Sequence, residues 1–188
     1  MKDFETENLK IRKFKLEDAN DVHENLATEE RLTKCLGYHI HKDVEETKIM
    51  VKSFIKEYEM NEYIWAIEEK DSNIVIGYLR ASEISKSNKL CKIKFGIGLK
   101  WLDTGYMEEA LNCILNYLFE EGFNIIITEF CDGHEELTKI KEKILKNVWM
   151  KKEASLSNRR INKKTKLSEN LIIYSIMKEE FEEKLQNK

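Results

Sequence analysis

The chain has no proline, and only seven of its 188 residues are glycine. Proline normally ends helices and starts turns, so the turns must be located here from clusters of Gly, Asn and Asp. The sequence also lacks an apolar run near the roughly 20 residues that a membrane-spanning helix needs, and its acidic start, Met1–Glu7, lacks the apolar core of a secretion signal. We therefore expect a soluble cytoplasmic protein with no membrane partner.

Motifs for metal binding and redox chemistry are missing as well. The four cysteines are far apart and form no Cys-x-x-Cys pair: Cys35, Cys91, Cys113 and Cys131. This spacing argues against a zinc site or a redox dithiol and predicts reduced, mostly buried thiols. His39 and His41 fall in an expected loop, but a third ligand would have to come from elsewhere, so we expect no metal.

No charge of either sign predominates. The 32 Lys and Arg residues and the 35 Asp and Glu residues balance to −3, which excludes a whole-molecule attraction to DNA or to an anionic membrane. The only concentrated basic stretch, Lys151–Lys152 with Asn158–Lys166, has no interleaved aromatic residues, and its longer part lies between two expected strands. We interpret it as a solvated hairpin loop, an interpretation that disfavours contact with RNA or the ribosome.

What the sequence does contain is a clear apolar periodicity. In the first half it predicts a strand, two helices and then three strands: Asn8–Phe14, Leu16–Leu26, Glu45–Met60, Tyr63–Glu68, Asn73–Ser82 and Leu90–Leu99. The spacers between the last three are of hairpin size, so these strands should pair antiparallel. The chain length suits one domain, and we expect a single domain over residues 1–188.

The second half begins with a helix that is apolar over most of its circumference. The predicted elements are a helix ended by Gly122, a strand, a helix and two strands: Tyr106–Phe119, Phe123–Thr128, His134–Lys146, Val148–Leu156 and Asn170–Met177. The order strand, helix, strand around the apolar helix implies a parallel crossover. The expected fold class is therefore mixed α/β.

Gly105 lies at the hinge between the strand Leu90–Leu99 and this apolar helix. Such an arrangement directs the unpaired N–H groups of a helix N-terminus toward the mouth of a sheet, which suits a phosphate or pyrophosphate ligand. A tight turn that needs a positive φ or a close approach would use the same glycine. Both interpretations stay open at this point.

Several blocks of the sequence, taken in order, resemble a known family. They are Leu9–Ala19, Trp65–Ile67, Ile74–Gly77, Gly105–Leu111, Met150–Asn158, Arg160–Lys164 and Leu171–Ile176. Nearly end to end, the chain resembles the GNAT superfamily of acetyl-CoA-dependent N-acetyltransferases, and within it the branch of the ribosomal-protein N-terminal acetyltransferases. The resemblance implies an α/β fold with a GNAT-like mixed, mostly antiparallel sheet, a parallel splayed pair at its centre and helices on both faces.

The resemblance also implies acetyl-CoA as cosubstrate and names the residues that would bind it. The pantetheine would pair with the backbone of Phe95, Gly96 and Ile97, and the pyrophosphate would lie on the amides of Leu102, Asp103, Thr104, Gly105, Tyr106 and Met107. The implied reaction is direct attack of a neutral amine on the thioester, with a base for the amine proton and an acid for the leaving thiolate. The acceptor pocket would be lined by the first helices and the loop near Gly37–His41.

The cofactor loop departs from the family pattern. Leu102 replaces an Arg or Gln, and Asp103 stands where a further glycine is usual. The Asp103 carboxylate would repel a nearby pyrophosphate, and Glu108 and Glu109 add negative charge in the first helical turn, so cofactor affinity should be reduced. Asp103 or Thr104 could instead serve as an ordinary helix N-cap.

The catalytic positions depart from the pattern too. The place of the family's glutamate base falls on Lys92, so that either burial lowers the lysine pKa, or Glu83 substitutes, or proton removal is left to water. The family's Asn-x-x-Ser motif falls on Glu135–Thr138 when aligned from the preceding strand, and on Thr138–Lys141 when aligned back from Met150. The candidate catalytic residues are Thr138, which keeps a hydroxyl, and Glu83.

Two functions follow from different classes. We expect an N-acetyltransferase that moves an acetyl group from acetyl-CoA to a primary amine, either a protein N-terminus or a small molecule. The alternative is a catalytically weak or silent GNAT-fold protein for CoA sensing or for protein or ribosome binding, suggested by the joint alteration of Lys92, Leu102, Asp103 and Glu135. A third and weaker alternative is a ribosome-associated protein that uses Arg159 and Arg160. The sequence leaves the acceptor amine and a homodimer open.

Overall fold

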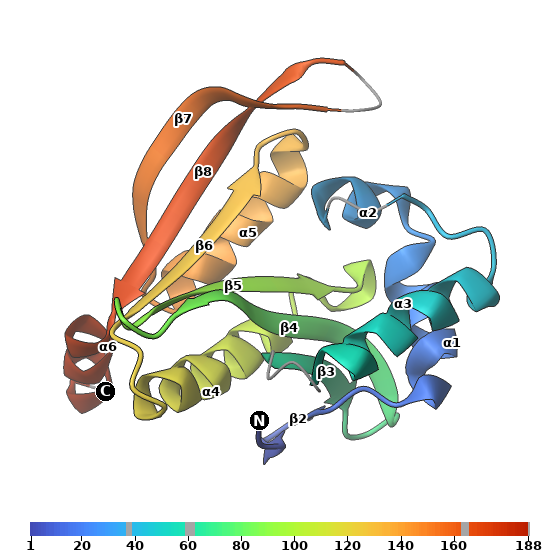
Figure 1. The fold of residues 1–188 in the computed structure, drawn as a ribbon, viewed down its shortest axis with the longest axis horizontal. Coiled ribbons are helices and arrows are strands. Elements are labelled where there is room, and N and C mark those ends of the chain that lie inside the picture. Colours follow the sequence, from blue (N-terminus) through green and yellow to red (C-terminus); the bar gives the residue numbers. More distant parts are fainter. Residues whose placement is uncertain (37–38, 59–62, 163–165, 188) are drawn as a thin grey trace. The chain divides into compact units, whose positions relative to one another are not determined.

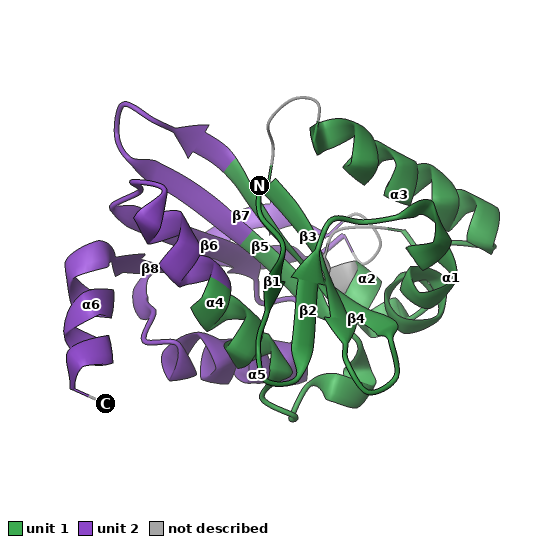
Figure 2. Ribbon diagram, turned by 90° about the horizontal axis from the view of Figure 1, so that it is seen from below, with its two compact units in different colours: residues 1–82, 94–113 green, residues 83–93, 114–188 purple. Residues whose placement is uncertain are grey.

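The computed structural model describes residues 1–36, 39–58, 63–162 and 166–187. The chain folds into helices and an eight-stranded sheet (Figure 1) and divides into two compact units (Figure 2). The first unit comprises Met1–Ser82 and Lys94–Cys113, and the second comprises Glu83–Ile93 and Ile114–Lys188. The single domain expected over residues 1–188 stays a prediction.

The first unit contains the N-terminal strands, the early helices and the start of the long apolar helix. Its elements are β1 (Phe4–Glu5), β2 (Leu9–Arg12), a 3₁₀ turn (Leu16–Asp18), α1 (Ala19–Val22), a π-helical turn (His23–Ala27), α2 (Glu30–Leu36), α3 (Val44–Glu57), β3 (Tyr63–Glu69), most of β4 (Ile74–Ser85), the last part of β5 (Leu90–Ile97), a 3₁₀ turn (Leu99–Trp101) and the first half of α4 (Tyr106–Glu120).

The second unit contains the ends of β4 and α4, the start of β5 and all later elements. These are β6 (Ile125–Cys131), α5 (Glu135–Asn147), β7 (Lys151–Ile161), β8 (Ser168–Met177) and α6 (Lys178–Gln186). Among the described residues, no helix is long and apolar enough to cross a bilayer.

The strand order in the sheet is β1-β2-β3-β4-β5-β6-β8-β7. The pairs β1–β2, β2–β3, β3–β4, β6–β8 and β7–β8 are antiparallel, whereas β5 and β6 are parallel. The parallel register joins Leu90 to Ile125, Cys91 to Ile126 and Lys92 to Ile127, at the start of each strand. The expected mixed, mostly antiparallel sheet with one parallel pair is therefore confirmed.

The core of the first unit contains buried residues of the strands that the sequence predicts, together with residues of its helices. Leu9 and Ile11 alternate inward on β2, and Trp65 on β3 is fully buried while its indole N–H donates to the Lys2 carbonyl at 3.0 Å. Gly77 of β4 lies close to the backbone of β5. A Cβ at this position would be only 2.6 Å from the Gly96 carbonyl oxygen. Only glycine allows the two strands to approach in this way.

The core of the second unit gathers around the end of α4, the sheet and the C-terminal helix. Phe181 of α6 is 1% exposed and lies 5.2 Å from Phe119 of α4, measured between ring centroids. Gly122 has φ +97° directly after α4, and its amide donates to the Phe119 carbonyl at 3.2 Å. The predicted stop of the apolar helix at this glycine is confirmed.

Several predicted boundaries are wrong. The helix expected over Leu16–Leu26 is a succession of 3₁₀, α and π turns, and the sequence pattern did not reveal α2 or α6. α2 has only seven residues, and α6 has one buried anchor, Phe181, so neither presents a repeated apolar stripe. The predicted start of the strand after α4, Phe123, also lies outside β6.

The basic stretch Asn158–Lys166 is not simply a hairpin loop. Asn158–Ile161 belong to β7, which pairs with β8, while residues 163–165 lie outside the described part of the chain. Every β7 residue except Ala154 is exposed, so the strand shows no alternation of buried and exposed side chains that a sequence pattern could reveal. The register with β8 shifts twice, between Lys152 and Ala154 and between Leu156 and Arg160, and Asn158 has φ +54°.

Candidate functional site

Gly105 lies in the loop that precedes α4, and it has φ +83°. A Cβ built on this glycine would meet nothing within 4 Å, so the position needs the left-handed backbone rather than close packing. A glycine here could be required by a positive φ or by a close neighbour, and the structure shows that the positive φ is the reason. The loop thereby turns from the 3₁₀ turn Leu99–Trp101 into the first turn of α4.

The Thr104 hydroxyl supports the start of α4. It accepts a hydrogen bond from the Tyr106 amide at 3.3 Å and donates to the Trp101 carbonyl at 2.9 Å. The Glu109 amide donates to the Gly105 carbonyl at 3.0 Å. The Gly105 carbonyl thus accepts the first helical bond, so Gly105 is the N-cap and the N-cap predicted at Thr104 is wrong by one residue. Three amides of the segment Leu102–Met107 are used within the loop, because those of Leu102 and Thr104 donate to the Leu99 and Trp101 carbonyls at 3.4 Å each.

Acidic side chains surround this loop. The Glu109 carboxylate accepts hydrogen bonds from the backbone and side-chain nitrogens of Asn8, each at 2.8 Å. Burial raises the pKa of Glu109, but hydrogen bonds from Asn8 and other neighbours outweigh it and hold the pKa below its ordinary value. The pKa of Tyr106 is raised, first by burial and then by the negative charges of Glu69, Asp71 and Glu109.

The backbone conformation of this loop favours an anion, whereas the negative side chains near it oppose one. The positive φ of Gly105 and the helix N-terminus are what an anion on backbone amides requires. Of the nearby cations, Lys70 donates to the Thr6 carbonyl at 2.6 Å and pairs with Glu5 at 3.3 Å, and Lys100 lies 5.8 Å from the centre of the Trp101 ring. Carboxylates close to the loop weaken any binding of a doubly charged group.

Phe95, Gly96 and Ile97 form the last part of β5, and all three are buried. Directly after them, the Gly98 amide donates to the Ile76 carbonyl of β4 at 2.8 Å. The recorded register of β5 with β6 covers Leu90–Lys92, which precedes this segment.

Lys92 is held by two carboxylates in the second unit, and we call Lys92, Glu83 and Glu129 the Lys92 cluster. The ammonium lies 2.7 Å from Glu83 Oε2 and 3.2 Å from Glu129 Oε2. The hydrogen bond to Glu83 raises the pKa of Lys92, burial opposes this, and Glu129 raises it further, so that the pKa lies above its ordinary value. The suggestion that burial leaves Lys92 with a lowered pKa is therefore wrong, because the two carboxylates outweigh burial, and a lysine in this state cannot take a proton at neutral pH.

Glu83, the candidate base, stands in an unusual backbone conformation. Its φ is +51°, in the left-handed region that costs a residue with a side chain about 1 kcal/mol. Its side chain is 54% exposed, so water reaches the carboxylate while Lys92 holds it on one side. A strained residue that presents a carboxylate beside a fixed cation is a feature that functional sites often show.

Sequence reasoning missed Glu129, the third member of the Lys92 cluster. Its position follows from the register, because Lys92 pairs with Ile127 and Glu129 comes two residues later on the same face of β6. The alternating run Ile125–Cys131 predicts a strand, but only the pairing of β5 with β6 would have connected this carboxylate with Lys92.

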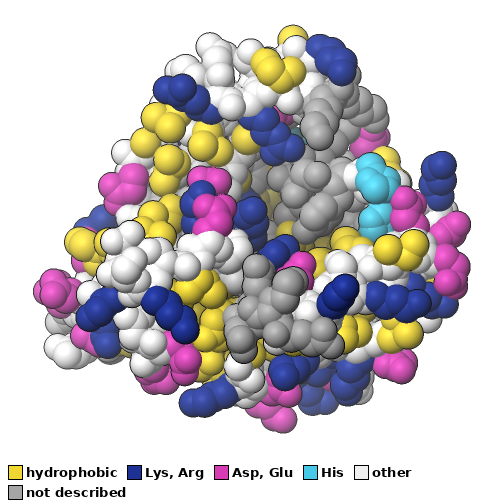
Figure 3. Space-filling model, in the orientation of Figure 1, with side chains coloured by type: hydrophobic (Ala, Val, Ile, Leu, Met, Phe, Trp, Pro, Cys, Tyr) yellow, Lys and Arg dark blue, Asp and Glu magenta, His cyan; other side chains and the backbone are white. Residues whose placement is uncertain are grey.

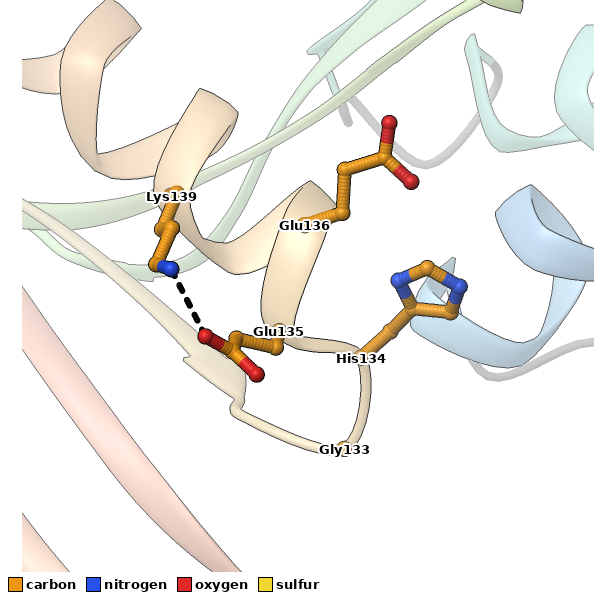
Figure 4. Close-up of a pocket in the computed structure, with 5 residues that line it drawn as sticks. All are labelled: Gly133, His134, Glu135, Glu136 and Lys139. Atoms are coloured by element: carbon orange, nitrogen blue, oxygen red, sulfur yellow. Dashed lines mark hydrogen bonds and ion pairs between the residues drawn. The ribbon is translucent and has the colours of Figure 1, made fainter.

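Thr138 lies in the first turn of α5, half-buried, and its amide donates to the His134 carbonyl at 2.9 Å. Around the start of this helix is a pocket of about 570 Å³, lined by Gly133, His134, Glu135, Glu136 and Lys139. Figure 4 shows Glu135 turned toward Lys139, with which it forms an ion pair of 2.6 Å, and Glu136 pointing away from both. Within the described residues, the structure records no contact between Thr138 and the Lys92 cluster.

A second cavity, of about 600 Å³, lies in the first unit, and we call it the α3 cavity. It is lined by His39 and His41, by α3 and by four strand residues, Ile64 of β3, Tyr78 and Arg80 of β4 and Lys94 of β5. The acceptor pocket is expected near the first helices and Gly37–His41, of which Gly37 and Tyr38 lie outside the described residues. Figure 3 shows histidine side chains beside acidic and hydrophobic ones on the face drawn there.

Histidines of this region are joined through Thr47, which is fully buried. Its hydroxyl lies 2.9 Å from His23 Nδ1 and 2.8 Å from His41 Nδ1, and His39 Nε2 lies 2.5 Å from the Glu46 carboxylate. Burial lowers the pKa of His41. Among residues 1–36, 39–58, 63–162 and 166–187, no three His, Cys, Asp or Glu side chains come together as metal ligands, and Cys91, Cys113 and Cys131 form no disulfide.

Solved structures share this fold over almost the whole chain. An acetyltransferase of the GNAT family from Bacillus anthracis is 21% identical with a TM-score of 0.79, covering 95% of this chain and 100% of that one. A ribosomal-protein-S5-alanine acetyltransferase from Vibrio fischeri is 16% identical with a TM-score of 0.78, covering 96% and 99%. The ribosomal-protein acetyltransferase RimL, solved in complex with coenzyme A, is 13% identical with a TM-score of 0.77, covering 94% and 98%.

The sequence itself matches the family model described as the acetyltransferase (GNAT) domain over residues 8–144. The comparison with curated proteins found no match. The matched range runs from β2 into α5, and so includes the Gly105 loop, the α3 cavity and the Lys92 cluster. The resemblance drawn from the sequence is confirmed, and the chain belongs to the GNAT acetyltransferase family.

Proposed function

We propose that this protein is an N-acetyltransferase that moves the acetyl group of acetyl-CoA to a primary amine. The observation that carries the proposal is Gly105 at φ +83° ahead of the buried helix α4, in a chain of the GNAT family. In this proposal the backbone of Phe95, Gly96 and Ile97 pairs with the pantetheine. The pyrophosphate lies on the loop whose members are Leu102, Asp103, Thr104, Gly105, Tyr106 and Met107.

In the proposed reaction the amine nitrogen attacks the acetyl carbonyl carbon directly. A bond from nitrogen to carbon forms, the carbon–sulfur bond breaks, the amine loses a proton and the leaving thiolate gains one. We assign the first proton transfer to the Glu83 carboxylate, because Lys92 is a fixed cation and Glu83 is the exposed carboxylate beside it. We assign the second to the Thr138 hydroxyl at the start of α5.

A second candidate function is a CoA-binding protein with little or no turnover. It is favoured by one observation, the raised pKa of Lys92 at the place where the family has a carboxylate base. In such a protein acetyl-CoA binds, but no amine releases free CoA above the rate in water. A broad panel of amines separates the two functions.

Calorimetric titration with acetyl-CoA tests the proposal, and the chain offers a matched pair of variants. Gly105→Ala and Gly122→Ala both place a Cβ on a glycine with positive φ in open space, at opposite ends of α4. Both should lower the free energy of unfolding by about 1 kcal/mol, because alanine is strained there. Only Gly105→Ala should weaken acetyl-CoA binding, by about tenfold or more.

The outcome that contradicts the proposal is equally clear. If the unaltered protein does not bind acetyl-CoA, or if the two alanine variants weaken binding alike, the Gly105 loop is not the cofactor site. Binding without release of CoA from any amine supports the second candidate function.

A further inference from the structure

The α3 cavity has an apolar floor. Phe54, Ile64 and Tyr78 line it and are at most 7% exposed, and the rings of Phe54 and Tyr78 are stacked with centroids 6.4 Å apart. Ile49 and Met50 of α3 add further apolar surface. A cavity of about 600 Å³ has the size of a small-molecule site. A hydrocarbon or aromatic group would be well accommodated on this floor.

Some charged side chains around this floor have a partner of opposite charge or a hydrogen bond, and one has neither among the described residues. The Arg80 guanidinium pairs with Glu57 at 3.2 Å, and the Glu46 carboxylate is held by His39 at 2.5 Å and by the Lys42 amide at 2.8 Å. For Lys94, by contrast, the structure records neither an ion pair nor a hydrogen bond within the described residues. The cavity therefore presents one cation that a bound anion can satisfy, next to an apolar surface.

Lys94 also has a distinctive place in the chain. It directly precedes Phe95, Gly96 and Ile97, the β5 segment to which the proposed function assigns the cofactor's pantetheine. An anionic group bound at Lys94 would thus lie close to the acetyl group. An acceptor that binds Lys94 and reacts with the acetyl group must therefore carry its anionic group close to its reacting amine.

We propose that the α3 cavity binds an α-amino acid with a hydrophobic side chain as the acetyl acceptor. The carboxylate binds Lys94, the side chain packs on Phe54, Ile64 and Tyr78, and the amine is acetylated with loss of one proton as the thiolate leaves and gains one. This inference rests on the proposed function. A protein N-terminus has no carboxylate on the carbon that bears its amine, so it would leave Lys94 without a partner.

The test compares three acceptors and two lysine variants. L-phenylalanine, L-phenylalaninamide and a short peptide with a free N-terminus are each assayed for acetylation by release of CoA. Their binding is measured by calorimetry with and without acetyl-CoA. Lys94→Met removes the cation at an exposed position, and Lys52→Met removes an exposed lysine of α3 outside the cavity lining as the control.

In the unaltered protein we expect kcat/KM to be about tenfold or more higher for phenylalanine than for its amide, because only the acid forms a charge-assisted hydrogen bond. Lys94→Met should reduce this preference to within about twofold, whereas Lys52→Met should retain it. Acetylation of the peptide but not of phenylalanine overturns the proposed acceptor and leaves the acetyl transfer intact. A preference of equal size in Lys94→Met overturns it too.

If no amine is acetylated, the binding data still decide. If phenylalanine binds, and if Lys94→Met weakens this binding about tenfold while Lys52→Met does not, the α3 cavity is a binding site for the amino acid. The proposed acetyl transfer then fails on its own. Absence of phenylalanine binding, both with and without acetyl-CoA, overturns the inference.

Discussion

Lys92 and Lys94 are two residues apart on β5, yet their surroundings differ completely. Lys92 is 22% exposed and lies between the carboxylates of Glu83 and Glu129, which together raise its pKa. Lys94 is exposed, lines the α3 cavity and has no recorded partner within the described residues. The same residue type therefore serves two purposes, because a lysine with two fixed carboxylates is a structural element and one without them is available to a ligand.

The largest effect should come from reversing the charge of Lys92. Lys92→Glu places a third carboxylate beside Glu83 and Glu129, and we expect the free energy of unfolding at neutral pH to fall by about 3 kcal/mol. Urea denaturation measures this loss. The double variant Lys92→Glu with Glu129→Lys restores one cation to the cluster and should recover more than half of the stability. An equally unstable double variant would show that the charges of the cluster do not determine its stability.

The next effect concerns catalysis by the Lys92 cluster. Glu83→Gln removes the proposed base, and kcat should fall about a hundredfold, within the range for loss of general base catalysis. Glu129→Gln is the matched control, because it removes the other carboxylate bound to Lys92 and should change kcat by less than about threefold. Steady-state kinetics with saturating acetyl-CoA measure both. Equal losses would mean that the two carboxylates only position Lys92.

A smaller effect is expected from His41 beside the α3 cavity. Burial lowers its pKa, so below about pH 6.5 the unfolded chain binds a proton more readily than the folded protein. The contribution of neutral His41 to stability is therefore fully present above about pH 6.5 and is lost as the pH falls from there through the lower pKa of the folded state. Between pH 7.5 and 5, the unaltered protein should lose more free energy of unfolding than His41→Gln, as measured by urea denaturation. A loss of the same size in His41→Gln would exclude His41 as its source.

The smallest effect completes the comparison of the two lysines. Lys94→Met should change the free energy of unfolding by less than about 0.5 kcal/mol, because no recorded ion pair is broken. Thermal unfolding of Lys94→Met and of Lys92→Met side by side checks this. A destabilisation of equal size in both would mean that Lys94 also has a structural partner.

The sequence predicts well those elements whose burial is continuous or regular. The apolar run of α4 and the glycine that follows it mark both ends of the helix to within one residue, and the strands Tyr63–Glu69 and Leu90–Ile97 follow their apolar patterns. Such patterns fail for β7, whose residues are exposed on both faces, and for α6, which has the single anchor Phe181. These elements are formed by pairing and packing with distant residues, which a local pattern does not contain.

The residues of the candidate site likewise fall into those that a local sequence signal reveals and those that depend on distant neighbours. Gly105 could be singled out from its place between a strand and an apolar helix, because a hinge glycine is a local signal. The pairing of Lys92 with Glu129 depends on the register of β5 and β6, and the cation at Lys94 is significant only because the walls of the α3 cavity surround it. Three-dimensional neighbours thus decide which charged residues are neutralised.

The two ends of the sheet protect it from other chains. At one end β1 has only two residues, and at the other the long strand β7 is interrupted by two register shifts and carries Lys151, Lys152, Arg159 and Arg160. A second polypeptide could not extend hydrogen bonds evenly along either border, and the cations would repel an identical strand. The protein should therefore stay dispersed at concentrations where a smooth, uncharged border would seed fibrous aggregates.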